Sequence, residues 1–214
     1  MEQSRNENGA FRTAGEGEAA VLRMEKLCKS YDGKTVLKDF TEELREGECC
    51  VLTGPSGSGK TTLLRLILGL EEADAGQIRS PRPLKTSVVF QEDRLFESFN
   101  AAENCAAVLG KGPDMPGDRE IREALSEILP ADELDKPVAE LSGGMRRRVC
   151  LVRACLYPSD LLLLDEPFTG LDDKNRALCI RFLLKHRKGR TLLLSSHGTE
   201  GLEFCREISV VNLN

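Results

Sequence analysis

The chain has 214 residues, of which 40 % are apolar and 30 % are charged, as is typical of a globular protein with one domain, or with one domain and a sub-lobe. This composition excludes a disordered chain and a collagen-like repeat. The formal net charge of −5 opposes general attraction to phosphate backbones, so we predict no nucleic-acid partner.

Targeting signals and cysteines indicate where the chain works. No apolar run approaches the roughly 18 residues of a membrane span, and residues 1–20 lack the basic and then apolar order of a secretory signal. We therefore expect a flexible tail over 1–20 and a cytosolic chain. The eight cysteines contain no C-x-x-C pair, so we expect small buried thiols rather than disulfides or metal ligands.

The first half of the chain is predicted to form strands around a glycine-rich loop. Alternating apolar and polar residues predict strands over 21–27 and 35–44, with Asp32-Gly33 as the hairpin turn between them. A more continuously apolar strand is expected over 48–53. After the glycine-rich loop, apolar residues on nearly all sides predict a buried helix over about 60–70.

The second half is predicted to alternate strands and helices around an inserted lobe. The expected strands are 87–90, 161–164, 191–195 and 208–211, and the expected helices are 101–109, 118–129, 142–157 and 173–186. Alternation of this kind implies crossover connections and a buried parallel sheet, so the fold class is α/β. The helical pieces between about 92 and 157 form a candidate sub-lobe.

The strongest motif is GPSGSGKT, which matches the phosphate-loop pattern G-x-x-x-x-G-K-[ST] between a predicted strand and a predicted helix. Backbone N–H groups of such a loop converge on phosphate oxygens at a helix N-terminus. Lys60 would bridge the β- and γ-phosphates, and the Thr61 hydroxyl would bind Mg²⁺. The predicted nucleotide-binding residues here are Gly54, Pro55, Ser56, Gly57, Ser58, Gly59, Lys60, Thr61 and Thr62.

Two further motifs point to nucleotide hydrolysis. The strand LLLL ends in Asp165 and Glu166, which would hold Mg²⁺ and orient or deprotonate the attacking water, respectively. Ser142, Gly143 and Gly144 form a second anion site at a helix start. Since one nucleotide rarely needs two phosphate-binding loops from the same chain, we expect this second site to contact ATP that is bound by another copy. The following run 146–148, three arginines, is predicted to be a solvated helix face.

Together these motifs resemble the nucleotide-binding subunit of an ATP-binding-cassette (ABC) transporter. The resemblance covers about 21–214 and implies a P-loop NTPase with the ABC ATPase fold: a mostly parallel core sheet, an N-terminal antiparallel β subdomain and a small helical subdomain. It also implies ATP and Mg²⁺ as ligands and hydrolysis of ATP coupled to transport.

The same resemblance assigns four more residues. It implies that Tyr31 stacks on adenine, that Gln91 touches Mg²⁺ and reports to the membrane partner, that Asp172 crosses a dimer interface, and that His197 senses the γ-phosphate. His186 is expected to be a solvated helix-end histidine without a role. The implied catalytic residues are Lys60, Gln91, Glu166 and His197, and the implied metal ligands are Thr61, Gln91 and Asp165.

The resemblance also implies partners and a location. Met145 and the segment FQEDRLF are similar to the importer ATPases for nitrate, sulfonate or taurine. This implies a homodimer or paired cassette, transmembrane permease subunits and an extracytoplasmic solute-binding protein, at the cytoplasmic face of the cell membrane. An exporter or a lipid or lipoprotein extractor would use the same residues. A non-transport ATPase and a purely regulatory ATP-binding module are further alternatives, and intact Glu166 and His197 argue against the latter.

Overall fold

The computed structural model describes residues 19–110, 112 and 115–210. The expected N-terminal tail therefore lies almost entirely outside the described residues, as does the last residue of the strand expected over 208–211. In the described part of the chain, no helix has the length and apolar character to cross a membrane.

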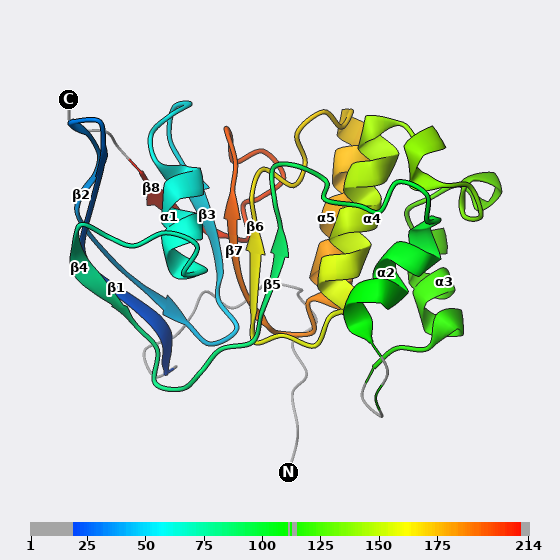
Figure 1. The fold of residues 1–214 in the computed structure, drawn as a ribbon, viewed down its shortest axis with the longest axis horizontal. Helices are drawn as coiled ribbons and strands as arrows, with labels where there is room; N and C mark the ends of the chain where they lie inside the picture. The colour runs from blue at the N-terminus through cyan, green and yellow to red at the C-terminus, as the bar shows by residue number, and fades with distance from the viewer. Residues whose placement is uncertain (1–18, 111, 113–114, 211–214) are drawn as a thin grey trace, which may run out of the picture.

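A three-stranded antiparallel sheet forms one side of the molecule, in the order β2-β1-β4 (Figure 1). Strand β1 (Ala20–Tyr31) pairs with β2 (Lys34–Arg45), and the predicted Asp32-Gly33 turn closes this hairpin. Both turn residues have positive φ, as a tight hairpin requires. Strand β4 (Ala75–Arg79) was not predicted, because only one of its five residues is even partly buried and the sequence shows no apolar alternation.

A five-stranded parallel sheet forms the centre, in the order β5-β6-β7-β3-β8. Its members are β3 (Cys49–Thr53), β5 (Thr86–Val89), β6 (Leu161–Leu164), β7 (Thr191–Ser195) and β8 (Arg206–Ser209). Every residue of β3, β6 and β7 is buried, which explains their continuous apolar runs. The predicted parallel α/β sheet is confirmed.

Helices cover both faces of this sheet (Figure 1). Helix α1 (Lys60–Ile67) lies between the two sheets, whereas α4 (Gly143–Leu156) and α5 (Asp173–His186) cover the opposite face. Helices α2 (Ala101–Leu109) and α3 (Asp118–Ser126) pack outside α4, with short 3₁₀ turns at Ala131–Glu133 and Val138–Glu140. Two hydrophobic cores result, one on each face of the parallel sheet.

The cysteines serve mainly as packing residues. All eight are free thiols and six are buried, as predicted, whereas Cys28 and Cys205 are half-buried. Adjacent Cys49 and Cys50 point to opposite faces of β3 and contribute to different cores. Burial raises the pKa of Cys50, Cys105 and Cys155 to about 12, so these three thiols stay protonated at neutral pH.

Candidate active site

The phosphate-loop sequence lies between β3 and α1, and two of its glycines, Gly54 and Gly59, leave no room for a side chain. Gly54 has φ 146°, and an added Cβ would lie 2.3 Å from the carbonyl oxygen of Val210. Gly59 has φ 102°, and a Cβ there would lie 2.7 Å from Cγ1 of Val36. Larger residues would clash with the strands on either side, so the loop can keep its backbone close to both sheets only with glycine.

Lys60 places its ammonium group inside this loop. Its Nζ donates to the carbonyl oxygens of Gly54 at 2.8 Å and Pro55 at 3.1 Å, and the residue is buried. A buried cation on a loop of backbone amides at a helix N-terminus suits a polyphosphate.

Asp165 and Glu166 follow β6 at the carboxyl edge of the parallel sheet, where ligands bind in open α/β sheets. Ser195, the last residue of β7, holds both. Its Oγ donates to Oδ1 of Asp165 at 2.6 Å and accepts from the backbone N of Glu166 at 2.9 Å. Ser195 was not predicted as a site residue, and only its place as the polar residue that ends an apolar strand could have suggested it.

The structure brings Glu166 and His197 together. Oε1 of Glu166 lies 2.9 Å from Nε2 of His197, and the hydroxyl of Thr169 donates to Oε2 at 3.3 Å. The Glu166 side chain is largely buried, while the His197 side chain is 56 % exposed. The histidine thus faces solvent beside a fixed carboxylate.

The three predicted metal ligands line one small cavity of about 20 Å³, enough for about one water-sized group. Thr61, Gln91 and Asp165 line it, and their side chains carry hydroxyl, amide and carboxylate oxygens; Arg65 and Arg94 line it as well. Hard oxygen donors of this kind are what Mg²⁺ prefers, so the donor set fits the ion.

Tyr31 stands at the end of the β1–β2 hairpin, beside α1. The residue is 40 % exposed, its hydroxyl donates to Glu71, and Thr62 lies within hydrogen-bond reach. Partial burial and the Glu71 carboxylate raise the pKa of Tyr31, so the phenol stays neutral. Lys29 lies 5.4 Å from the ring centroid.

The second anion motif begins α4, on the opposite face of the sheet from α1 (Figure 1). The Ser142 side chain caps this helix by accepting from the backbone N of Met145 at 3.3 Å, and Gly143 and Gly144 form its first turn. Asp172 caps α5 by accepting from the backbone N of Asn175 at 2.8 Å. These residues therefore do not join the phosphate loop of the same chain.

Two expectations about solvated residues are wrong. In the arginine run 146–148, Arg147 and Arg148 are only 6 % and 8 % exposed. Their guanidinium groups bond backbone carbonyls of other segments, which compensates for their burial. His186 stacks on Phe182 with ring centroids 4.1 Å apart, and its Nε2 lies 3.0 Å from the Glu127 carboxylate.

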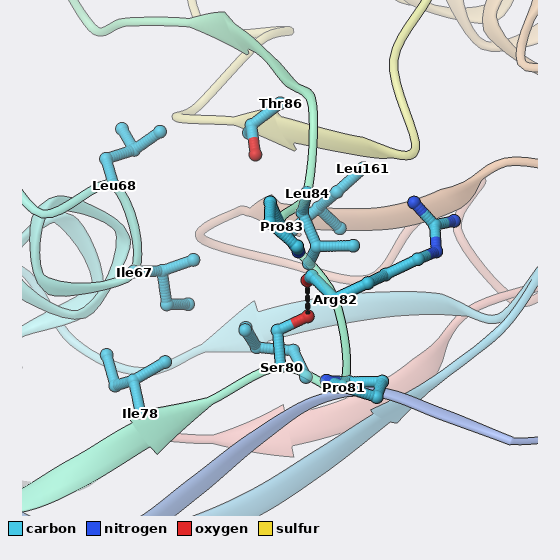
Figure 2. A pocket seen from close by; sticks show the side chains of 11 residues that line it. Ile67, Leu68, Ile78, Ser80, Pro81, Arg82, Pro83, Leu84, Thr86 and Leu161 are labelled. Atoms are coloured by element: carbon cyan, nitrogen blue, oxygen red, sulfur yellow. Dashed lines mark hydrogen bonds between the residues drawn. The ribbon is translucent and has the colours of Figure 1, made fainter.

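A separate cavity of about 630 Å³ lies at the amino ends of β5 and β6 in the parallel sheet (Figure 2). Thr86 and Leu161, the first residues of β5 and β6, line it together with Ile67 from the end of α1. Arg82 also lines it and pairs with Asp160 at 2.8 Å. Because the phosphate loop follows the carboxyl end of β3, this cavity is distinct from the candidate nucleotide site.

The fold and the site define an ATP-binding cassette: a phosphate loop, a strand-end carboxylate pair with histidine, and a second glycine motif at the start of α4. Residues 37–169 match the family model described as "ABC transporter". The chain belongs to this family and carries an ABC-type ATPase domain.

Curated relatives include both import and export proteins. The Nod factor export ATP-binding protein I of Paraburkholderia xenovorans is 38 % identical, covering 90 % of this chain and 68 % of the relative. The sulfate/thiosulfate import ATP-binding protein CysA of Xylella fastidiosa is 36 % identical, and the match covers 89 % of this chain and 60 % of the relative. The aliphatic sulfonates import ATP-binding protein SsuB 3 of Rhodococcus jostii is 43 % identical, covering 75 % and 58 %. The chain thus spans about three-fifths to two-thirds of the length of these relatives.

Among solved structures, a dimeric ATP-binding cassette in a post-hydrolysis state bound to ADP and Pi superposes with a TM-score of 0.79. It is 26 % identical, and the match covers 89 % of this chain and 94 % of that chain. A putative ABC transporter ATP-binding protein from Pyrococcus furiosus gives a TM-score of 0.78 at 26 % identity, covering 88 % and 96 %. The predicted ABC ATPase fold is confirmed.

Proposed function

We propose that this chain binds ATP with Mg²⁺, hydrolyses ATP, and powers uptake of a small solute through separate membrane subunits. The observation that carries the proposal is that Asp165 lines a cavity together with Thr61 and Gln91, while the next residue, Glu166, contacts His197. Phosphoryl transfer needs positioning and charge stabilisation, and this set provides both.

In the proposed mechanism each residue has one task. Lys60 binds the β- and γ-phosphate oxygens and offsets their charge, and Tyr31 stacks on the adenine. Thr61, Gln91 and Asp165 would hold Mg²⁺, which neutralises charge on the phosphates when bound. Glu166 orients or deprotonates the attacking water, with its backbone fixed through Ser195.

His197 completes the proposed catalytic set. Its Nε2 lies 2.9 Å from Oε1 of Glu166, so the imidazole is within hydrogen-bond distance of the carboxylate. From this position the imidazole would link the Glu166 carboxylate to the γ-phosphate. Its exposed ring can turn toward a phosphate oxygen without disrupting the core.

We also propose that two copies, or two paired cassettes, act together. Ser142, Gly143 and Gly144 would contact ATP held by the phosphate loop of the other copy, and Asp172 would lie at that interface. The proposal is supported by the position of α4 away from the chain's own phosphate loop and by the dimeric assembly named for a structural neighbour.

The proposed setting is the cytoplasmic face of a membrane, where permease subunits hold the cassette and an extracytoplasmic protein delivers the solute. The domain would span 21–214, with the helical sub-lobe of about 92–157 inserted and 1–20 as a tail. Two relatives are named for import of sulfate, thiosulfate or sulfonates, and this supports uptake. Export is the second candidate, because another relative is named for Nod factor export.

Substitution Glu166→Gln tests the ATPase proposal. We expect ATP binding to persist, turnover to fall at least ~10²-fold through loss of the general base, and an ATP-bound dimer to accumulate. The measurements are nucleotide binding, phosphate release and light scattering, made on the full chain copurified with its membrane subunits.

The control is Glu72→Gln, which alters an exposed carboxylate outside the site. Wild-type turnover in the Glu166→Gln complex would overturn the role of Glu166. Failure of the wild-type complex to release phosphate would overturn the proposed ATPase function itself.

A further inference from the structure

One buried arginine connects three parts of the candidate active site. Arg147 lies in the second turn of α4 and is 6 % exposed. Its Nη1 donates to the carbonyl oxygens of Phe90 at 2.5 Å and Gln91 at 3.1 Å. Its Nη2 donates to those of Asp165 and Glu166, both at 2.9 Å. A single planar guanidinium thus spans the ends of β5 and β6.

The bond to Glu166 fixes an unusual backbone. Glu166 has φ 47°, in the left-handed region that residues other than glycine rarely adopt. Its N–H is held by Ser195 at 2.9 Å and its C=O by Arg147 at 2.9 Å. Because both sides of this residue are restrained, the direction of the Glu166 side chain depends on Arg147 as well as on the strand.

The segment that carries Gln91 is held by the same face of α4. One turn after Arg147, Sγ of Cys150 donates to the carbonyl oxygen of Asp93 at 2.8 Å. After a further turn, Nη1 of Arg153 donates to the carbonyl oxygen of Arg94 at 2.9 Å. Residues three apart lie on one side of a helix, so α4 holds this segment at three successive points.

The charge of Arg147 is only partly matched by an acid. The nearest carboxylate is that of Asp93, whose Oδ1 lies 3.6 Å from Nη1, while the four carbonyl contacts range from 2.5 to 3.1 Å. A lysine has the same charge but no planar fork, and cannot reproduce four divergent bonds from one position. The contribution of Arg147 is therefore mainly geometric.

We propose that Arg147 is a positioning residue, which sets Gln91 and Glu166 relative to one another and links both to the helix that begins with the Ser142–Gly144 motif. The inference rests on the proposed ATPase function and adds a connection to it. When a second copy contacts the start of α4, any shift of this helix would move the Arg147 guanidinium and with it the backbone of Glu166. Assembly of the composite site and alignment of the Glu166 base are therefore coupled.

The chain contains a matched control. Arg190 also uses its guanidinium to bind several carbonyls, including those of Cys155 at 2.6 Å, His186 at 2.7 Å and Tyr157 at 2.8 Å. It lies just before β7, at the amino end of the parallel sheet. Removing it should destabilise the fold without disturbing the carboxyl edge, where Glu166 lies.

The experiment compares Arg147→Met and Arg147→Lys with Arg190→Met and Arg190→Lys in the complex of the full chain with its membrane subunits. We measure kcat and KM for ATP, Mg²⁺-dependent binding of a fluorescent ATP analogue, and the thermal unfolding midpoint. We expect both Arg147 variants to lower kcat by about 10²-fold, the size typical of lost positioning. Binding of the analogue should change by less than about 3-fold, below 1 kcal/mol.

The Arg190 variants should lower the thermal unfolding midpoint at least as much as the Arg147 variants do. Their kcat should stay close to wild type at a temperature where all variants are folded. If Arg147→Met fails to fold, Arg147→Lys alone decides the question. A wild-type kcat in Arg147→Lys, or an equal loss of kcat in the Arg190 series, would overturn the inference. An inactive wild-type complex would instead overturn the proposed function.

Discussion

At the scale of single residues, Ser195 connects Asp165 and Glu166, the two acidic residues proposed to act in the site. It is fully buried, and its hydroxyl bonds both the Asp165 carboxylate and the Glu166 backbone N–H. Water cannot replace a bond at a fully buried position without rearrangement. Loss of the hydroxyl therefore leaves a charged acceptor and a backbone donor without this partner.

We expect Ser195→Ala to lower kcat by about 10- to 100-fold, because a hydrogen bond to a charged group is worth about 1.5–3 kcal/mol. Steady-state phosphate release measures the effect. Ser196→Ala is the control, since the Ser196 hydroxyl accepts only a long 3.4 Å bond from Gly198. Equal kcat values for the two variants would contradict the assignment.

At the scale of elements, the phosphate loop depends on the antiparallel sheet beside it. Gly59 ends the loop in a left-handed conformation, directly against Val36 of β2. The hairpin that carries Tyr31 and the helix that carries Lys60 therefore pack through a position with no room for a side chain. The first sheet helps to shape the loop that would bind ATP.

Gly59→Ala should therefore lower the free energy of unfolding more than the same substitution at a left-handed glycine whose added Cβ would meet no neighbour. Gly33→Ala provides the comparison, since Gly33 has φ 77° and nothing within 4 Å of an added Cβ. We expect about 1–2 kcal/mol for Gly33→Ala from backbone strain, and about 1–3 kcal/mol more for Gly59→Ala from overpacking. Urea unfolding measures both, and equal losses would refute the steric argument.

At the scale of the whole molecule, the two glycine motifs lie on opposite faces of the parallel sheet (Figure 1). The phosphate loop leads into α1 between the sheets, and Ser142–Gly144 begins α4 on the far face. In a pair of chains related by a twofold axis, the phosphate loop of each chain could face the Ser142–Gly144 motif of the other chain. Such a pair would contain two composite sites.

This arrangement predicts complementation between two inactive chains. Lys60→Ala destroys one phosphate loop, and Gly144→Asp places a negative charge in the second motif. A mixed dimer would contain one doubly damaged site and one intact site. We expect the equimolar mixture to recover up to about a quarter of wild-type phosphate release, as random pairing into symmetric dimers implies. If mixing restores nothing above the separate variants, the two motifs do not act in trans.

Much of the fold and of the site could be predicted because the signals are local. The phosphate loop, the Asp165–Glu166 strand end and the glycine motif at 142–144 are each continuous in sequence, and hydrophobic periodicity indicated most strands and helices. Strand β4 was missed because its residues are mostly exposed and leave no periodic pattern.

The sequence by itself determined the family resemblance, the parallel sheet and the candidate nucleotide-binding residues, since contiguous motifs carry their own local geometry. The tertiary structure alone decided that Glu166 meets His197, that Ser195 joins the Asp165 carboxylate to the Glu166 backbone, and that Arg147 is buried on four carbonyls rather than solvated. The physical reason is that these contacts join residues 18 to 57 positions apart, and strand order and helix packing bring them together. A charged helix face looks the same in sequence whether water or the backbone of another segment accepts its hydrogen bonds.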